Sequence, residues 1–180
     1  MVEPWEIPPI PPHGDITPNE VHIARSRAID EWERVENCLM MLDGLFAQSL
    51  GKQSCYGKGK IFVNRLESIE RFGRQYFIRH PNQTVESEFD ELIFSLKSYS
   101  QRRHDIAHGI VDILLTKENQ RMDTIEFALI TAFYVIDRPR HTKFFPTFAY
   151  NASTLLSFES KFSDLGKHVR SFTYRLFQIP

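Results

Sequence analysis

The stretch "NASTLLSFESKFSDLGKHVRSFTYRL", residues 151–176, decides the fold class of this chain. Its large apolar residues recur at spacings of three and four without a break, which is the period of one helix face. Asn151 or Ser153 is placed to cap the start of the helix. The segment therefore predicts a long closing helix whose inner face packs against other helices. That face consists of Leu155, Phe158, Phe162, Leu165, Val169, Phe172 and Leu176.

A first helix is predicted near the other end of the chain. In "TPNE", residues 17–20, Thr17 is the expected N-cap, Pro18 takes the first helical position, and Glu20 completes a capping box. We expect this helix to end near Gly51, because glycine is common just past a helix C-terminus. Its apolar stripe is Ala28, Trp32, Val35, Leu39, Leu42 and Phe46.

Two more helices are expected in the middle of the chain. One runs from about Lys60 to Ile78, since Pro81 disfavours helical geometry at the residue before it. The other begins after Thr84 as its cap and ends at Gly109. The inner positions are Ile61, Leu66, Ile69 and Phe72 in the former, and Phe89, Leu92, Ile93, Leu96 and Tyr99 in the latter.

The residue composition changes after this third helix. The segments "GIVDILL", residues 109–115, and "TIEFALITAFYVI", residues 124–136, are rich in β-branched and aromatic residues and flank a polar linker. They predict a β-hairpin. The expected fold class is thus mainly α: a helical bundle of about four long helices with a small β-hairpin before the last helix.

The N-terminal residues 1–18 hold six of the ten prolines, which excludes helix and favours an extended arm. Trp5, Ile7 and Ile10 are candidates to pin this arm to a surface, and a partly disordered tail is the alternative. We therefore divide the chain into an arm, residues 1–18, and a single helical domain, residues 19–180.

Composition limits the choice of partners. Lys and Arg together number 22 against 23 acidic residues, so the net charge of −1 gives no general attraction to nucleic acid or anionic membranes. Any surface that binds phosphate must therefore depend on a local cluster of basic residues. No signal segment and no membrane-spanning run of apolar residues is present, which favours a cytoplasmic protein without a membrane partner. We expect Cys38 and Cys55 to be reduced thiols.

The richest cluster of chemical groups is "RRHDIAHG", residues 102–109, at the end of the third helix. At about 100° per residue, His104 and His108 share one face, Asp105 lies beside His108, and Arg103 lies about 140° around from His108. Arg103 and His108 meet only if the helix loosens before Gly109, or if two copies face each other across a two-fold axis.

An arginine and a histidine suffice, in principle, to cleave RNA without a metal. Histidine titrates near neutrality and can take a proton from the ribose 2′-hydroxyl or give one to the leaving oxygen. Arginine grips phosphate oxygens as charge builds on them. Because the nucleophile belongs to the substrate, this chemistry requires no metal-activated water and no cofactor.

The octet resembles the Arg-x(4–6)-His signature of the HEPN superfamily, the higher eukaryote and prokaryote nucleotide-binding domains. Arg103 and His108, with four residues between them, match the signature arginine and histidine, and His104 takes the following position, where the family favours a polar residue. Arg102 also fits, with five intervening residues, so the choice of arginine stays open. Many HEPN domains are metal-independent RNases of toxin–antitoxin, abortive-infection and RNA-processing systems.

This resemblance implies an endoribonuclease that acts as a homodimer, with paired motifs lining one cleft and a 2′,3′-cyclic phosphate as the product. Arg103 and His108 would be the catalytic pair, and Arg102, His104 and Asp105 would orient the substrate or that pair. RNA is the implied substrate, and an antitoxin protein is a possible partner. The main alternative is a non-catalytic HEPN-like module that binds RNA or protein.

A third hypothesis is a metal-dependent phosphohydrolase of the HD type, in which an adjacent His-Asp pair binds a metal that activates water. His104 and Asp105 are such a pair, and the further ligands would come from His80, Asp112 or Asp137. Two arginines beside the pair make a cation electrostatically awkward.

A purely structural interpretation of the octet is also open. In it the octet is a solvated helix end, Asp105 pairs with Arg102, and the histidines cap carbonyl groups.

Overall fold

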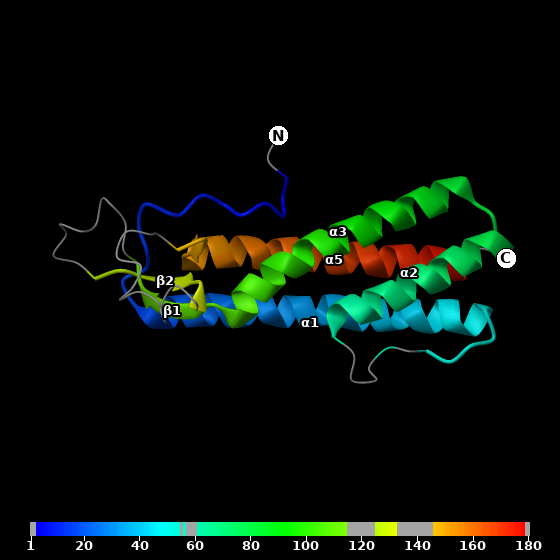
Figure 1. The fold of residues 1–180 in the computed structure, drawn as a ribbon, viewed down its shortest axis with the longest axis horizontal. Coiled ribbons are helices and arrows are strands. Elements are labelled where there is room, and N and C mark those ends of the chain that lie inside the picture. Colours follow the sequence, from blue (N-terminus) through cyan, green and yellow to red (C-terminus); the bar gives the residue numbers. More distant parts are fainter. Residues whose placement is uncertain (1–2, 55, 57–60, 115–124, 133–145, 179–180) are drawn as a thin grey trace. The chain divides into compact units, whose positions relative to one another are not determined.

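The computed structural model describes residues 3–54, 56, 61–114, 125–132 and 146–178. Within these residues the fold is mainly helical, with four helices and a three-stranded antiparallel sheet in the order β1-β2-β3 (Figure 1). The elements are α1 (Pro18–Ser49), α2 (Phe62–Arg79), α3 (Gln83–His108), β1 (Ile110–Ile113), β2 (Phe127–Ile130), β3 (Ala149–Tyr150) and α5 (Ala152–Phe177). The predicted fold class, with a hairpin before the last helix, is confirmed.

The chain divides into two compact units. The first unit holds Met1–Glu31 and Arg102–Lys161, and the second holds Trp32–Gln101 and Phe162–Pro180. Helices α1, α3 and α5 each contribute residues to both units. The predicted helix-end cluster and the sheet therefore belong to the first unit.

The second unit is a four-helix bundle built around aromatic rings. Phe46 of α1 packs on Tyr76 of α2 and on Phe89 of α3, with ring centroids 5.3 and 5.5 Å apart. Phe89 in turn stacks on Phe172 of α5 at 6.0 Å. One ring cluster thus joins all four helices of this unit, which is why their apolar stripes face inward.

The predicted stripes on α1, α3 and α5 are buried throughout. On α2 the expected inner residue Ile61 is instead 68% exposed. Ile61 precedes the first helical residue and has extended backbone, so its side chain does not follow the helical face. Lys60, the predicted start of this helix, lies outside the described residues.

The helix ends show which cap predictions hold. The N–H of Thr17 donates to Oε2 of Glu20, which is one half of the predicted capping box. At the start of α5, Oδ1 of Asn151 accepts from the N–H of Thr154 at 2.9 Å, so Asn151 is the cap. For α3 the prediction of Thr84 is wrong: Oδ1 of Asn82 accepts from the N–H of Val85, and the helix already includes Thr84.

The N-terminal arm joins the sheet of the first unit. Asp15 pairs with Phe127 of β2 through two backbone hydrogen bonds of 2.8 Å. Its carboxylate accepts from the N–H of Ala152 and so caps the start of α5. Of the three residues expected to pin the arm, Ile7 and Ile10 are exposed and Trp5 is half-buried. The arm is held at its end by Asp15, because that residue supplies both a strand pairing and a helix cap.

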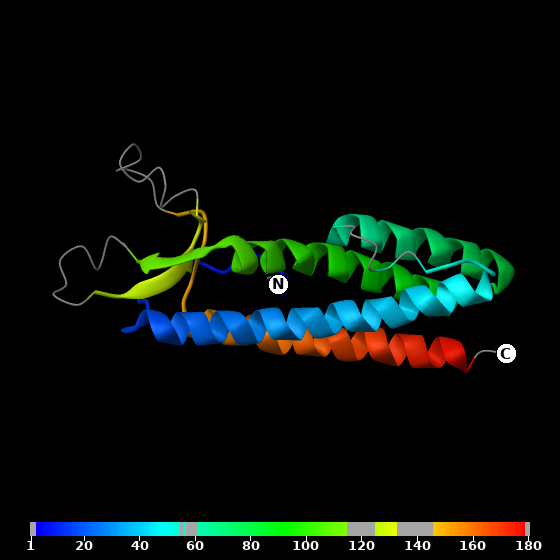
Figure 2. The ribbon, with the colours of Figure 1, turned by 90° about the horizontal axis from the view of Figure 1, so that it is seen from below.

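The hairpin pairs β1 with β2 antiparallel (Figure 2), and its register places Val111 opposite Leu129. The third strand, β3, was not predicted; it pairs Tyr150 with Leu129. Leu114, Ala128, Ile130 and Ala149 form a buried apolar cluster in this region. The sheet is thereby fixed directly before α5.

Two further expectations concern thiols and membranes. Cys38 is buried and free, as expected of a packing thiol, whereas Cys55 lies outside the described residues. Of the helices in the described part of the chain, none has the length and apolarity needed to cross a membrane.

Two helical glycines of the second unit give a matched stability test. A Cβ at Gly73 would collide with the ring of Phe89, whereas a Cβ at Gly44 would meet nothing within 4 Å. Alanine in a helix gains about 0.5–1 kcal/mol over glycine, and overpacking a core costs about 1–3 kcal/mol. We expect Gly44→Ala to raise the free energy of unfolding and Gly73→Ala to lower it, measured by urea denaturation. Equal effects of the two substitutions would contradict the packing of α2 on α3.

Candidate functional site

The last turns of α3 carry the predicted cluster on a regular helix. The helix continues to His108, and the N–H of Gly109 still donates to the carbonyl of Asp105, four residues earlier, at 2.8 Å. The loosening of the helix before Gly109 that would bring Arg103 and His108 together is therefore absent. Within one chain these two side chains leave the helix in different directions.

His104 and His108 lie together on the exposed side of this helix end. Their ring centroids are 4.5 Å apart and the rings are tilted by 48°. Both side chains are exposed. The prediction that they share a face is confirmed, and the structure presents two imidazoles side by side to solvent.

Arg102 and Asp105 form the buried side of the cluster. Nη1 of Arg102 lies 3.2 Å from Oδ2 of Asp105, and Arg102 is only 7% exposed. The hydroxyl of Tyr150, on β3, donates to the same Oδ2 at 3.2 Å. The pairing expected of a structural helix end is present, but it is buried rather than solvated. Asp105 therefore ties the end of α3 to the sheet.

Electrostatics at Asp105 follow from this position. Burial raises the pKa of the Asp105 carboxyl above its ordinary value of 3.8, and the Arg102 charge and the Tyr150 hydrogen bond partly offset that rise. Burial next to the Asp105 carboxylate also raises the pKa of the Tyr150 hydroxyl, which therefore keeps its proton and remains a donor.

Arg103, the other predicted catalytic residue, is half-buried, and its Nε is enclosed by the protein. Its neighbour Arg102, by contrast, is buried, and its guanidinium lies against Asp105. Of the two arginines that fit the signature spacing, Arg103 is the more accessible to a ligand.

Arg25 is a residue that sequence reasoning missed. From the first part of α1 its Nη2 donates to the carbonyl of Ala107, one of the last carbonyls of α3. Such carbonyls have no partner within the helix, so a guanidinium there both satisfies one and offsets the negative end of the helix dipole. Beside this contact lies a hollow of about 330 Å³. It is lined by His22, Arg25, Ser26, Ile29, Asp30 and Ala107.

Gly109 fixes where the helix end meets the sheet. A Cβ here would lie 2.8 Å from Cγ of Leu129 and 3.0 Å from the carbonyl oxygen of Asp105. Its φ is not positive, so it does not end the helix in the left-handed conformation of the predicted glycine cap. Glycine is required because β2 approaches closely. Gly51 is the residue that adopts positive φ after a helix, at 65°.

The residues of the HD-type hypothesis do not gather in the described structure. Among the residues that are placed, no three His, Cys, Asp or Glu side chains form a group that could hold a metal ion. Asp112 is in β1, where its Oδ1 accepts from the N–H of Ile113, and His80 belongs to the second unit. Asp137 lies outside the described residues.

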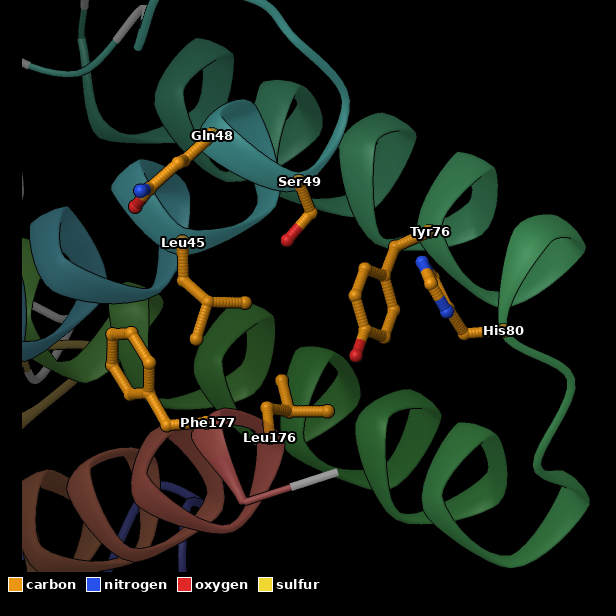
Figure 3. Close-up of a pocket in the computed structure, with 7 residues that line it drawn as sticks. All are labelled: Leu45, Gln48, Ser49, Tyr76, His80, Leu176 and Phe177. Carbon is orange, nitrogen blue, oxygen red and sulfur yellow. The ribbon is translucent and has the colours of Figure 1, made fainter. Parts of the chain in front are cut away.

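A hollow of about 370 Å³ in the second unit offers a different environment (Figure 3). The rings of Tyr76 and His80 lie beside each other with centroids 4.7 Å apart. Burial raises the pKa of the Tyr76 hydroxyl, which points toward Leu176 in Figure 3. The described lining includes no Lys or Arg, so the end of α3 is the better candidate for binding a phosphate.

Comparison with models of protein families, with curated proteins and with solved structures gave no match to this chain. The functional argument therefore depends on the residues at the end of α3.

The environment of Asp105 generates a test by titration. In Arg102→Met and in Tyr150→Phe the pKa of Asp105 should rise above its value in the wild type, because each substitution removes a group that stabilises the carboxylate. The measurement is an NMR titration of the Asp105 side-chain carbonyl carbon, with Arg170→Met, in the second unit, as the control. An Asp105 pKa that is equal in all four proteins would contradict the arrangement.

The same shift has a consequence for stability. Since the folded pKa lies above the unfolded value, protonation of Asp105 favours the folded state, and this contribution is lost as the pH rises through the folded pKa. Relative to Asp105→Asn, the wild type should therefore gain stability on acidification. Denaturation of both proteins across that range measures the difference.

The Arg102→Met variant should also be less stable than the wild type. Removing one partner of a buried ion pair costs about 3–5 kcal/mol, and we expect a smaller loss of unfolding free energy here because the side chain of Asp105 is 18% exposed.

Proposed function

We propose that this protein is a metal-independent endoribonuclease of the HEPN type, in which Arg103 and His108 act on the scissile phosphodiester. The observation that carries the proposal is the end of α3, where His104 and His108 stand side by side in solvent on a turn that is fixed from several sides. Groups held in fixed directions are what catalysis needs, because binding then brings the substrate into a prepared geometry.

Three contacts hold this turn. Arg25 binds the carbonyl of Ala107, Tyr150 binds Asp105, and Gly109 packs against Leu129. None of them uses the imidazoles. His108 is therefore available as general base or acid toward the 2′-hydroxyl and the leaving oxygen, and His104 lies close enough to orient the phosphate or exchange a proton.

The guanidinium of Arg103 supplies the positive charge for the phosphate in this proposal. Because Arg103 and His108 point in different directions within one chain, the pair acts across a symmetric homodimer, with the arginine of one copy facing the histidine of the other. A composite site is also compatible with the net charge of −1. The chain as a whole does not attract RNA, so the positive charge that binds a phosphate has to be concentrated where the two motifs meet.

The second candidate function is a non-catalytic HEPN-like module that binds RNA or a protein. The divergence of Arg103 and His108 on one helix favours it, because a chain that acts alone lacks a converged pair. A toxin–antitoxin or phage-defence role belongs to the first candidate, and expression toxicity that His108→Ala relieves would support it.

The decisive experiment incubates purified protein with RNA in EDTA and identifies the product ends. We expect cleavage that leaves 2′,3′-cyclic phosphates, and a loss of at least about 10²-fold in both Arg103→Ala and His108→Ala, since acid–base groups contribute about 10²–10⁴-fold. Arg170→Ala and His168→Ala, exposed residues of α5 in the second unit, are the matched controls and should retain activity. Cleavage that EDTA abolishes would point to the HD-type metal hydrolase, and absence of cleavage to the binding module.

Mixing the two inactive variants tests the composite site. In a heterodimer of Arg103→Ala and His108→Ala, one site keeps both functional groups and the other loses both. Equal mixing followed by subunit exchange should therefore restore about one quarter of wild-type activity. A mixture as inactive as its components, from a protein that is a dimer by mass, would rule out a site shared between subunits.

A further inference from the structure

The hollow at the start of α1 and the end of α3 opens next to the turn that carries His108. We name it the α1–α3 pocket; its lining is His22, Arg25, Ser26, Ile29, Asp30 and Ala107, all in the first unit. Its volume of about 330 Å³ is near the lower limit of small-molecule sites, which span about 300–1,000 Å³. A single planar group fits that size better than an extended ligand.

Two of its walls suit an aromatic ring. The guanidinium of Arg25 is held in place by its hydrogen bond to Ala107, and the ring of His22 is exposed beside it. Unpaired RNA bases stack on histidine rings and on arginine guanidinium planes. Ile29 is half-buried and adds an apolar contact. The pocket therefore has the surfaces that hold a nucleobase without regard to its identity.

Asp30 adds a group that can read the edge of a base. Its side chain is exposed and lines the pocket on the same helix as His22 and Arg25. An ionised carboxylate only accepts hydrogen bonds and can accept two side by side. Of the four RNA bases, guanine alone presents two adjacent donors, N1–H and the 2-amino group, on its pairing edge. A carboxylate here thus favours guanine over adenine, cytosine and uracil.

We propose that the α1–α3 pocket binds a guanine base next to the scissile phosphate, with Asp30 as the residue that selects it. The proposal rests on the proposed ribonuclease function, because the pocket adjoins Ala107, the residue before His108. Arg25 is then a binding residue with two contacts, one to the helix end and one to the base. In this proposal, a base held here directs the neighbouring phosphodiester toward the imidazoles of the adjoining turn.

Binding of mononucleotides tests the pocket without requiring catalysis. Titration with GMP, AMP, CMP and UMP, followed by NMR of the His22 and Asp30 signals, should show GMP binding about tenfold or more tightly than the others, since hydrogen bonds to charged groups contribute most to discrimination. Asp30→Asn should remove this preference. His22→Ala should weaken all four nucleotides alike, because stacking does not distinguish bases. Glu91→Gln, an exposed acid-to-amide change on α3 in the second unit, is the control and should bind as the wild type does.

Mapping of cleavage positions on a mixed-sequence RNA separates this proposal from the ribonuclease proposal. Enrichment of guanine beside the cut sites, lost in Asp30→Asn, supports both. Selective GMP binding that depends on Asp30, in a protein that cleaves no RNA, supports the pocket and overturns the ribonuclease. Cleavage without guanine preference and unchanged in Asp30→Asn, together with equal binding of the four nucleotides, supports the ribonuclease and overturns the pocket.

Discussion

The carboxylate of Asp105 is the constraint on which the first unit depends. It accepts the hydroxyl of Tyr150 from β3 and lies at ion-pair distance from Arg102, one turn earlier on α3. A half-buried carboxylate without these partners would carry a large desolvation cost, so helix end and sheet are held in one arrangement. The helix turn that carries His104 and His108 is connected to the sheet by this contact.

Much of the fold could be predicted because its signals are local. The capping box of Thr17 and Glu20 and the unbroken stripe of α5 depend only on neighbouring residues; the stripe is confirmed, and so is the half of the capping box in which Glu20 accepts from the N–H of Thr17. The two-residue strand β3 could not be predicted, since its pairing with Leu129 is decided by tertiary contact and its length gives no period. Asn82 was missed because Thr84, two residues later, also offers a capping side chain, although asparagine is the better N-cap of the two.

In the candidate site, too, the features set by local helix geometry could be predicted, and those set by tertiary contacts could not. Helical spacing correctly placed His104 and His108 on one face, and it also gave the divergence of Arg103, because both follow from the geometry of one helix. Arg25 and Tyr150 lie far from the octet in sequence, and nothing in their local surroundings marks them. The one signal for Arg25 is an arginine on α1 outside the buried apolar stripe. Because α1 carries several such arginines, the sequence does not show which of them contacts the end of α3.

The separation of Arg103 from His108 would give the fold a role in controlling the proposed chemistry. A rigid helix that converged both groups on one phosphate would be competent as a single chain. Here the regular helix keeps them apart, since the hydrogen bond from the N–H of Gly109 to the carbonyl of Asp105 continues the helical pattern through the last turn. In the proposed ribonuclease, joint action of the two groups requires association of chains, so the proposed activity would rise with protein concentration and fall when a partner covers the end of α3. The contacts that stabilise this turn would thereby also determine when it can react.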